Sequence, residues 1–299
     1  MRQGLIGEAT GSDRKARATR AARWWFSLAA IAVPALGGAG DYNPRILKAI
    51  EAMPRGGIYA KYRKDLPENQ RFDDLYRTVE DLGQAIRPGN GGALRIEASR
   101  AASHSFCSSA TYLLFCDVIA GLQRDGIVPA DAALSRALTE VGEKSEVIHG
   151  KRDGIGLFGH WNADGPGTAV LFRRLDLGTN FSSFEKARPG DFLKIFWNEH
   201  IGKGESGHLV VYLGTSPDGK AIDVWSSQTR NDDGSSGYGV MRVEKSRIAR
   251  ALFSRLERPE NLVRWIRYGP EEMKSDYLIR IRQTGSTVEE MRRETGAVD

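Results

Sequence analysis

The apolar positions of this sequence change their spacing along the chain, from a helical pattern to a strand-like pattern. Residues 43–53 read as a short helix, and residues 72–87 carry apolar side chains three and four positions apart, which predicts an amphipathic helix. Residues 106–123 are apolar on almost every helical face, so we expect a helix buried in the middle of a domain. Further helices are expected at 130–144 and 168–176.

After Pro189 the pattern becomes one of short, alternating or fully apolar runs separated by Gly, Pro and Asp. These runs predict strands at 191–197, 208–214, 221–227 and 238–243, paired as antiparallel hairpins in consecutive order. A helix on the sheet is expected at 244–256. Helices followed by a sheet indicate an α+β fold, in which the buried helix packs across an antiparallel sheet.

The 299 residues divide into a main domain with appendages. We expect residues 40–100 to be a helical lead-in packed on the core and residues 101–269 to be the main domain. The strongly charged residues 270–299 are expected to form a peripheral helix or a loose tail.

The N-terminus has the three-part pattern of a secretory signal peptide. A basic segment precedes the apolar run WWFSLAAIAVPAL at 24–36, and small residues follow up to Ala39, where cleavage is expected. A buried helix with a basic lead-in is the alternative. The run is too short to span a bilayer, for which about 20 residues are needed. The sequence therefore predicts an exported, periplasmic or secreted protein with no stable membrane insertion after removal of residues 1–39.

The positive charge of the chain is concentrated in this N-terminal segment. The formal net charge is +5, and residues 1–23 contain six basic and two acidic residues. The remainder is close to neutral, so the charge gives no reason to expect a nucleic-acid partner.

The two cysteines, Cys107 and Cys116, both fall in the predicted buried helix. Their spacing places them on opposite faces and roughly 13 Å apart along the helix axis, which is too far for a disulfide. Both are therefore expected to be free thiols. In an exported protein, where disulfides form readily, a free thiol indicates either chemistry or deep burial.

Cys107 lies at the start of the helix, where the partial positive charge of the N-terminus stabilises a thiolate. Ser103, His104 and Ser105 can cap the free N–H groups of the first turn. Cys116 lies among apolar residues inside the same helix, where a thiol is inert. The sequence thus makes Cys107 the candidate nucleophile, against the alternative that it is a small core residue.

A thiol nucleophile needs an imidazole base and a polar group that orients the imidazole. Of the five histidines, His208 opens an apolar strand after a flexible segment, so its ring is expected at the rim of the sheet. The next predicted strand ends in polar residues, and Gln228 is the first candidate for the orienting group. Ser226 and Asp223 are the second and third candidates.

A loop is expected at 158–167, where the sequence FGHWNADGPG is rich in Gly, Asn and Asp. Its residues His160, Trp161 and Asn162, with Ser105 beside the nucleophile, are the predicted substrate-binding set. His160 is also a rival for the role of base. The alternative is a surface turn with Trp161 in the core. The histidines and cysteines lack the spacings of metal sites, so no metal is predicted.

Three motifs in this order resemble the NlpC/P60 cysteine peptidases: FCSSATYLL at the helix start, RPGDFLKIF, and GHLVVYLG. The resemblance covers residues 106–228. It implies a papain-like α+β fold, a Cys-His-polar triad, no cofactor, and hydrolysis of peptide bonds in peptidoglycan. Phe106 stands where the family usually has Asp, and no Tyr or Gln occurs in the ten residues before Cys107, where relatives often have an oxyanion-binding or substrate-binding side chain.

The sequence thus predicts an exported cysteine hydrolase, a thiol protease or amidase acting on a cell-wall peptide or another amide. An acyltransferase or lipid-amide hydrolase on the same fold is one alternative, and it would have an apolar rim where a cell-wall enzyme would have a polar groove. A non-catalytic envelope binding protein is the other.

Overall fold

Helix α4 (Cys107–Arg124) is the central element of the computed structural model, which describes residues 40–268 and 270–299. Nearly all of its side chains are buried, and it packs against strands β7 (Gly207–Thr215) and β8 (Ala221–Gln228). The ring of Phe115 meets that of Phe192, on β6 (Phe192–Phe196), edge to face at 6.2 Å. The prediction of one buried helix across a sheet is confirmed.

The sheet has six strands in the order β5 (Gly178–Phe181), β10 (Arg250–Leu256), β6, β7, β8 and β9 (Gly237–Glu244), and every neighbouring pair is antiparallel. Strands β6, β7, β8 and β9 (Gly237–Glu244) follow one another in sequence and in space. The four predicted strands and their consecutive hairpins are therefore confirmed, and the fold is α+β with an antiparallel sheet.

The predicted helix at 244–256 is wrong, because Arg250–Leu256 forms strand β10. This strand lies between β6 and β5 (Gly178–Phe181), a strand that the apolar pattern did not predict. Most side chains of β10 are buried on both faces of the sheet. A strand buried on both faces reads as a continuous apolar run, which periodicity alone does not separate from a buried helix.

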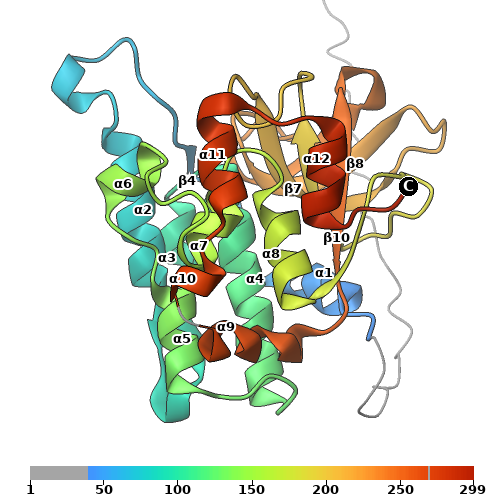
Figure 1. The fold of residues 1–299 in the computed structure, drawn as a ribbon. Helices are drawn as coiled ribbons and strands as arrows, with labels where there is room; N and C mark the ends of the chain where they lie inside the picture. Colours follow the sequence, from blue (N-terminus) through green and yellow to red (C-terminus); the bar gives the residue numbers. More distant parts are fainter. Residues whose placement is uncertain (1–39, 269) are drawn as a thin grey trace, which may run out of the picture. The chain divides into compact units, whose positions relative to one another are not determined.

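The two faces of the sheet have different partners. Helices α4, α8 (Gly167–Leu175), α11 (Asp276–Thr284) and α12 (Val288–Thr295) lie on one side of it (Figure 1). On the other side the apolar residues of the strands, among them Leu193, Val210, Val224 and Phe253, form a cluster of their own. The helical side contains α4 and thus the start of the helix that presents Cys107.

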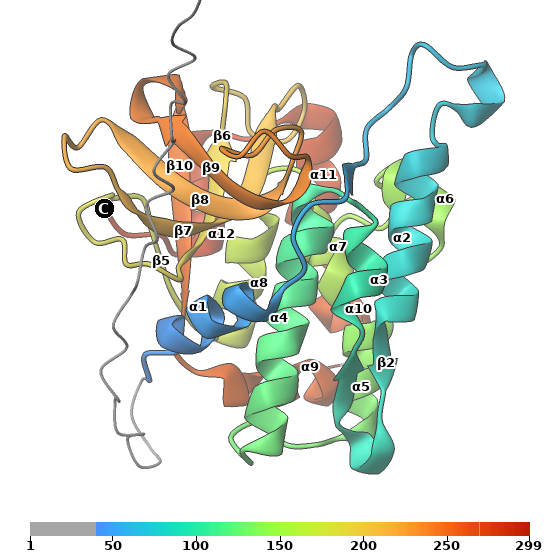
Figure 2. The ribbon, with the colours of Figure 1, turned by 180° about the vertical axis from the view of Figure 1, so that it is seen from behind.

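The remaining helices surround α4 (Figure 2). The predicted helices at 43–53 and 72–87 are confirmed as α1 (Asn43–Ala52) and α2 (Asp73–Ala85). The region predicted as one helix at 130–144 contains two short ones, α5 (Ala132–Thr139) and α6 (Lys144–Ile148). The short elements are α3 (Ala98–Ala102), α9 (Arg264–Arg267), α10 (Pro270–Met273), β2 (Ile86–Pro88), β3 (Leu94–Ile96), and 3-10 turns at Glu68–Gln70, Asn90–Gly92, Lys245–Arg247 and Pro259–Val263.

The expected loop at 158–167 is wrong in its first half, because Gly156–Asn162 forms helix α7. Leu157, Phe158 and Trp161 are buried along one side of this helix, and the ring of Phe158 packs on that of Tyr112 at 5.0 Å. Tertiary packing on α4 thus stabilises a helix in a sequence whose glycines and asparagine favour a loop.

The lead-in is joined to the start of α4 through backbone pairing. Strand β1 (Ile58–Tyr59) runs parallel to β4 (His104–Ser105), and Tyr59 pairs with Ser105. The amide of Ala60 donates to the carbonyl of Ser105 at 2.8 Å. Residues 58–60 therefore lie beside the strand that leads into the candidate nucleophile.

The C-terminal segment 270–299 packs on the domain through α11 and α12, whose buried residues include Leu278, Ile281 and Met291. The predicted signal peptide, residues 1–39, lies outside the described residues. None of the described helices is long and apolar enough to cross a membrane.

Candidate active site

Cys107 lies where strands β7 and β8 separate. The two strands pair from Val211 and Trp225 to Thr215 and Ile222, with a register shift between Tyr212 and Gly214. Toward their other ends, the start of α4 reaches the gap between them. The hydroxyl of Ser226 spans this gap, donating to the carbonyl of Leu209 at 2.8 Å and lying 3.4 Å from the carbonyl of Cys107. The site thus joins the end of a helix to the edge of two strands.

The thiol of Cys107 is half-buried and has a lowered pKa. Burial raises this pKa, but the imidazole of His208, through its charge and a hydrogen bond with the sulfur, lowers it. The backbone N–H of Leu209 and the charge of Lys194 lower it further, to about 7. A substantial fraction of Cys107 is therefore thiolate at neutral pH, which is the reactive form of a cysteine.

Cys116 is the opposite case on the same helix. It is fully buried, and burial raises the pKa of its thiol far above the usual range. Both cysteines are free thiols, as the sequence predicts. Only Cys107 has the environment of a nucleophile.

The ring of His208 is largely buried and lies nearly parallel to that of Trp197, with 6.3 Å between the ring centroids. This contact restricts the imidazole on the side of Trp197. In the part of the chain that the structure describes, no side chain of a candidate orienting residue is hydrogen-bonded to the His208 ring. The His208 ring is therefore held by packing against Trp197.

The three candidate orienting residues have other partners. The amide nitrogen of Gln228 donates to the carbonyl of Gly239 at 3.1 Å and to Oδ1 of Asn231 at 3.3 Å, while its Oε1 is buried without a partner. Ser226 bridges β7 and α4 as described above. Asp223 forms a bidentate ion pair with Arg242, 2.8 Å from its Nε.

The expected capping of α4 by Ser103, His104 and Ser105 is wrong. The residue that caps the helix is Phe106, whose N–H donates to the hydroxyl of Ser109 at 3.0 Å. Ser105 is buried and its hydroxyl lies 2.7 Å from that of Ser227 on β8. Because β4 runs straight into α4, these residues are held by strand pairing and contacts with the sheet rather than by the helix N-terminus.

Tyr59 is a close neighbour of Cys107 that the sequence did not reveal. The negative charge of a Cys107 thiolate raises the pKa of the Tyr59 phenol, and burial raises it further. The phenol therefore stays protonated over the working pH range and remains a hydrogen-bond donor.

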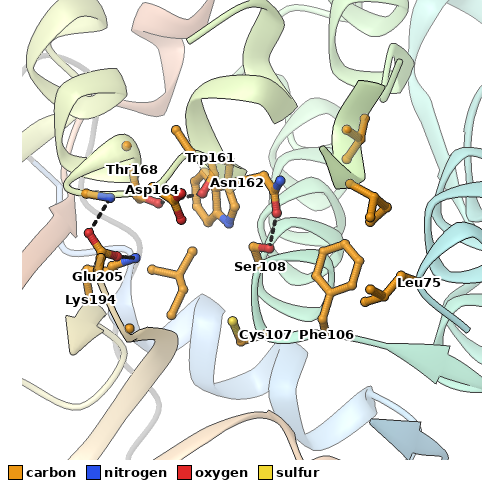
Figure 3. Close-up of a pocket in the computed structure, with 17 residues that line it drawn as sticks. Leu75, Phe106, Cys107, Ser108, Trp161, Asn162, Asp164, Thr168, Lys194 and Glu205 are labelled. Atoms are coloured by element: carbon orange, nitrogen blue, oxygen red, sulfur yellow. Dashed lines mark hydrogen bonds and ion pairs between the residues drawn. The ribbon is translucent and has the colours of Figure 1, made fainter. Parts of the chain in front are cut away.

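A cavity of about 270 Å³ opens beside Cys107 (Figure 3). Its lining is polar at one end, with Asp164, Lys194 and Glu205. At the other end it is apolar, with Leu75, Phe106, Val147 and Ile148. Figure 3 shows the sulfur of Cys107 between these two ends. A substrate that lies over the sulfur would thus contact polar residues on one side and apolar residues on the other.

The polar end is built around a buried ion pair. The ammonium of Lys194 lies 2.5 Å from Oε1 of Glu205, and Oε2 of Glu205 accepts hydrogen bonds from the backbone N–H groups of Gly165 and Gly202 at 2.6 and 2.9 Å. Asp164 is exposed on the rim. Desolvation and the charge of Glu205 raise the pKa of Asp164, against the opposing charges of Lys194 and Arg282.

Two of the four predicted substrate-binding residues line this cavity. Asn162 does so while its Oδ1 accepts from the hydroxyl of Ser108 at 2.5 Å. Trp161 is almost wholly buried, and its indole N–H donates to Thr111 at 3.0 Å, so it is mainly a core residue. The buried Ser105 hydroxyl faces Ser227 instead.

His160 is not a plausible base, because its ring is fully buried against its own helix. Its Nδ1 lies 2.8 Å from the carbonyl of Gly156, and burial lowers the pKa of the ring to about 4. The ring meets that of Trp265 edge to face at 5.6 Å. Because residues 156–162 form a helix, the ring of His160 lies in the core and not at the rim of the cavity.

One of the missed site residues left a signal in the sequence. Lys194 interrupts the apolar strand FLKIF, where a charged residue would be exposed or functional. Tyr59 left none, because it reaches the site through a strand of only two residues.

Comparison with protein-family models, with curated proteins and with solved structures gives no match for this chain. Within the described residues, no group of three or more His, Cys, Asp or Glu side chains is arranged to hold a metal ion.

Proposed function

We propose that this protein is a cysteine hydrolase that cleaves an amide or peptide bond through a thioester on Cys107. The observation that carries the proposal is the interaction of His208 with Cys107, which lowers the pKa of the thiol to about 7, together with the cavity that Cys107 lines. A thiolate and an imidazole in contact are the two groups that acyl transfer by cysteine requires.

The proposed reaction has two steps. His208 takes the proton of the Cys107 thiol and the sulfur attacks the carbonyl carbon. His208 then delivers this proton to the amine nitrogen as the carbon–nitrogen bond breaks. This releases the amine and leaves a thioester. His208 then takes a proton from water, whose oxygen attacks the thioester carbon, and the acid leaves as Cys107 is restored.

The oxyanion of each tetrahedral intermediate needs hydrogen-bond donors. Cys107 is the first residue of α4, so its backbone N–H is among those without a partner inside the helix. The protonated phenol of Tyr59 is the second donor that we propose. Both come from rigid elements that meet at β4.

The finer assignment of the fold and substrate rests on the motifs of the sequence. We propose a papain-like fold of the NlpC/P60 type, an exported protein, and a peptide of the cell envelope, as in peptidoglycan, as substrate. The support is the order of the helix with Cys107, the strand with the Pro-Gly-Asp turn, and the strand with His208, which pack together as α4, β6 and β7.

A second candidate, hydrolysis or transfer of an apolar acyl group, is favoured by the apolar end of the cavity. Leu75, Phe106, Val147 and Ile148 can contact an alkyl or aromatic group there. Peptide and acyl-amide substrates therefore both have a place beside Cys107, and only a comparison of substrates separates them.

The experiment is turnover of two substrate sets by the protein lacking residues 1–39. Purified peptidoglycan, with mass analysis of the fragments, tests the first candidate, and N-acyl amides of increasing chain length test the second. Cys107→Ala and His208→Ala should each abolish turnover while leaving the circular dichroism spectrum unchanged. Activity retained in either variant would overturn the roles of Cys107 and His208. No turnover together with no thiol reactivity at neutral pH would overturn the proposal in favour of a binding protein.

A further inference from the structure

The ion pair of Lys194 and Glu205 has no role in the proposed steps, although it lies in the same cavity as Cys107. The side chain of Lys194 is 16% exposed and that of Glu205 only 2%. Removing two charges from water costs several kcal/mol for each ion, which their attraction does not always offset. A buried pair of this kind in an otherwise apolar strand therefore calls for a functional explanation.

The carboxylate of Glu205 is fixed from two sides. One oxygen contacts the ammonium of Lys194, and the other accepts the N–H groups of Gly165 and Gly202. These two N–H groups partly balance the carboxylate charge. The ammonium has three N–H donors, so contact with one oxygen leaves it with donors for the cavity.

Gly207 leaves room for this arrangement directly before the catalytic base. A Cβ at Gly207 would lie 2.9 Å from both Cε and Nζ of Lys194, and 2.7 Å from Oε1 of Glu205. The ammonium therefore lies against the strand that carries His208. Lys194 also pairs across the sheet with Leu209, whose backbone N–H helps to lower the pKa of the Cys107 thiol.

The electrostatic effects of Lys194 and Cys107 on each other agree with this geometry. Burial lowers the pKa of Lys194, but Glu205 and the Cys107 thiolate more than offset it, so the ammonium stays charged. Lys194 in turn stabilises the Cys107 thiolate. None of the candidate orienting residues is hydrogen-bonded to His208 in the described part of the chain, so none of them orients the imidazole.

We propose that Lys194, fixed by Glu205, is a second cationic partner of the Cys107 thiolate and stabilises its negative charge alongside His208. Lys194 is thus a positioning residue that acts through the charge of the nucleophile. The inference rests on the proposed role of Cys107, but it can be measured without a substrate.

The test is the rate of alkylation of Cys107 by iodoacetamide as a function of pH, read by mass spectrometry of the intact protein. In the unchanged protein the midpoint should lie near pH 7. Lys194→Met should raise it by about one pH unit, because an opposite charge nearby shifts a pKa by about 1 to 3 units. Lys194→Gln, which keeps a donor toward Glu205, should give the same shift and serves if the methionine variant does not fold.

The matched control is Lys203→Met, which removes an exposed lysine from the adjacent loop and should leave the midpoint unchanged. The ratio of the rates with iodoacetate and iodoacetamide gives a second readout, because a cation in the cavity favours the anionic reagent. This ratio should fall in Lys194→Met and stay unchanged in Lys203→Met.

An unchanged midpoint in a folded Lys194→Met or Lys194→Gln variant would overturn the inference. A shifted midpoint in a protein that hydrolyses none of the substrates would support the role of Lys194 and count against the proposed function. Hydrolysis that depends on Cys107, together with an unchanged midpoint, would overturn the role of Lys194 alone.

Discussion

Tyr59 and Cys107 come from separate segments of the chain, yet the charge of the Cys107 thiolate is the main cause that raises the pKa of the Tyr59 phenol. The contact depends on the parallel pairing of Tyr59 with Ser105, two residues before the cysteine. The lead-in segment thus contributes a side chain to the candidate site and does more than cover the core.

This contact predicts the effect of removing one oxygen atom. Tyr59→Phe should lower kcat by about 10²-fold, the usual loss for one oxyanion donor, with little change in stability. Kinetics on the substrate found for the protein would measure it. The matched control is Tyr62→Phe, which changes an exposed tyrosine of the same segment. Equal kinetics in the two variants would remove Tyr59 from the mechanism.

Substitution of Cys107 should change thiol reactivity, whereas substitution of Cys116 should change stability. Cys107→Ala should abolish alkylation at neutral pH and leave the free energy of unfolding nearly unchanged, because the thiol is only half-buried. Cys116→Ala should keep alkylation at Cys107 and lower the free energy of unfolding by ~1 kcal/mol, since it leaves a small cavity in a fully buried site. Mass spectrometry and urea unfolding measure both. Rapid labelling of Cys116 in the folded protein would contradict this assignment.

Asp153 should make stability depend on pH. Burial and the charge of Asp164 raise its pKa to about 7, although Arg282 lies 3.4 Å away. The unfolded carboxyl has its ordinary, lower pKa, so the folded state binds the proton more tightly. The contribution of Asp153 to the free energy of unfolding is therefore most favourable at low pH. It is lost as the pH rises from about 4 to about 7.

Asp153→Asn should remove this part of the pH dependence and make the protein more stable above pH 7, by at most on the order of 4 kcal/mol. Urea unfolding at pH 5 and pH 8 gives the comparison. If the unchanged protein and the variant lose the same stability between these two values, Asp153 is not the titrating group.

Strand β10 should be essential to the core of the sheet. Phe253 is fully buried and its ring stacks on that of Phe181 at 5.1 Å. Phe253→Ala should lower the free energy of unfolding by about 3 to 5 kcal/mol. Val240→Ala, at an exposed position of β9, should change it by less than about 0.5 kcal/mol. Urea unfolding of the two variants checks this, and similar losses in both would argue against the packing of β10.

The apolar pattern was sufficient to predict the elements that bury one face or are buried on all faces. Helices α2 and α4 and strands β6 to β9 follow from it, because each shows its own period or a long apolar run. The pattern was insufficient for β10, whose run fits a buried helix equally well, and for α7, whose sequence favours a loop. In both cases contacts with distant residues decide the conformation, and no local window contains them.

The sequence by itself determined where the candidate nucleophile Cys107 and the candidate base His208 lie, because a helix start and a strand start are local features. Only the tertiary structure decided what surrounds them. Strand pairing places Tyr59 opposite Ser105, two residues before Cys107, and the ammonium of Lys194, paired with Glu205, belongs to a residue that lines the same cavity as Cys107. Charge and hydrogen bonding act over a few ångströms in space, and distance along the chain does not reveal which groups come that close.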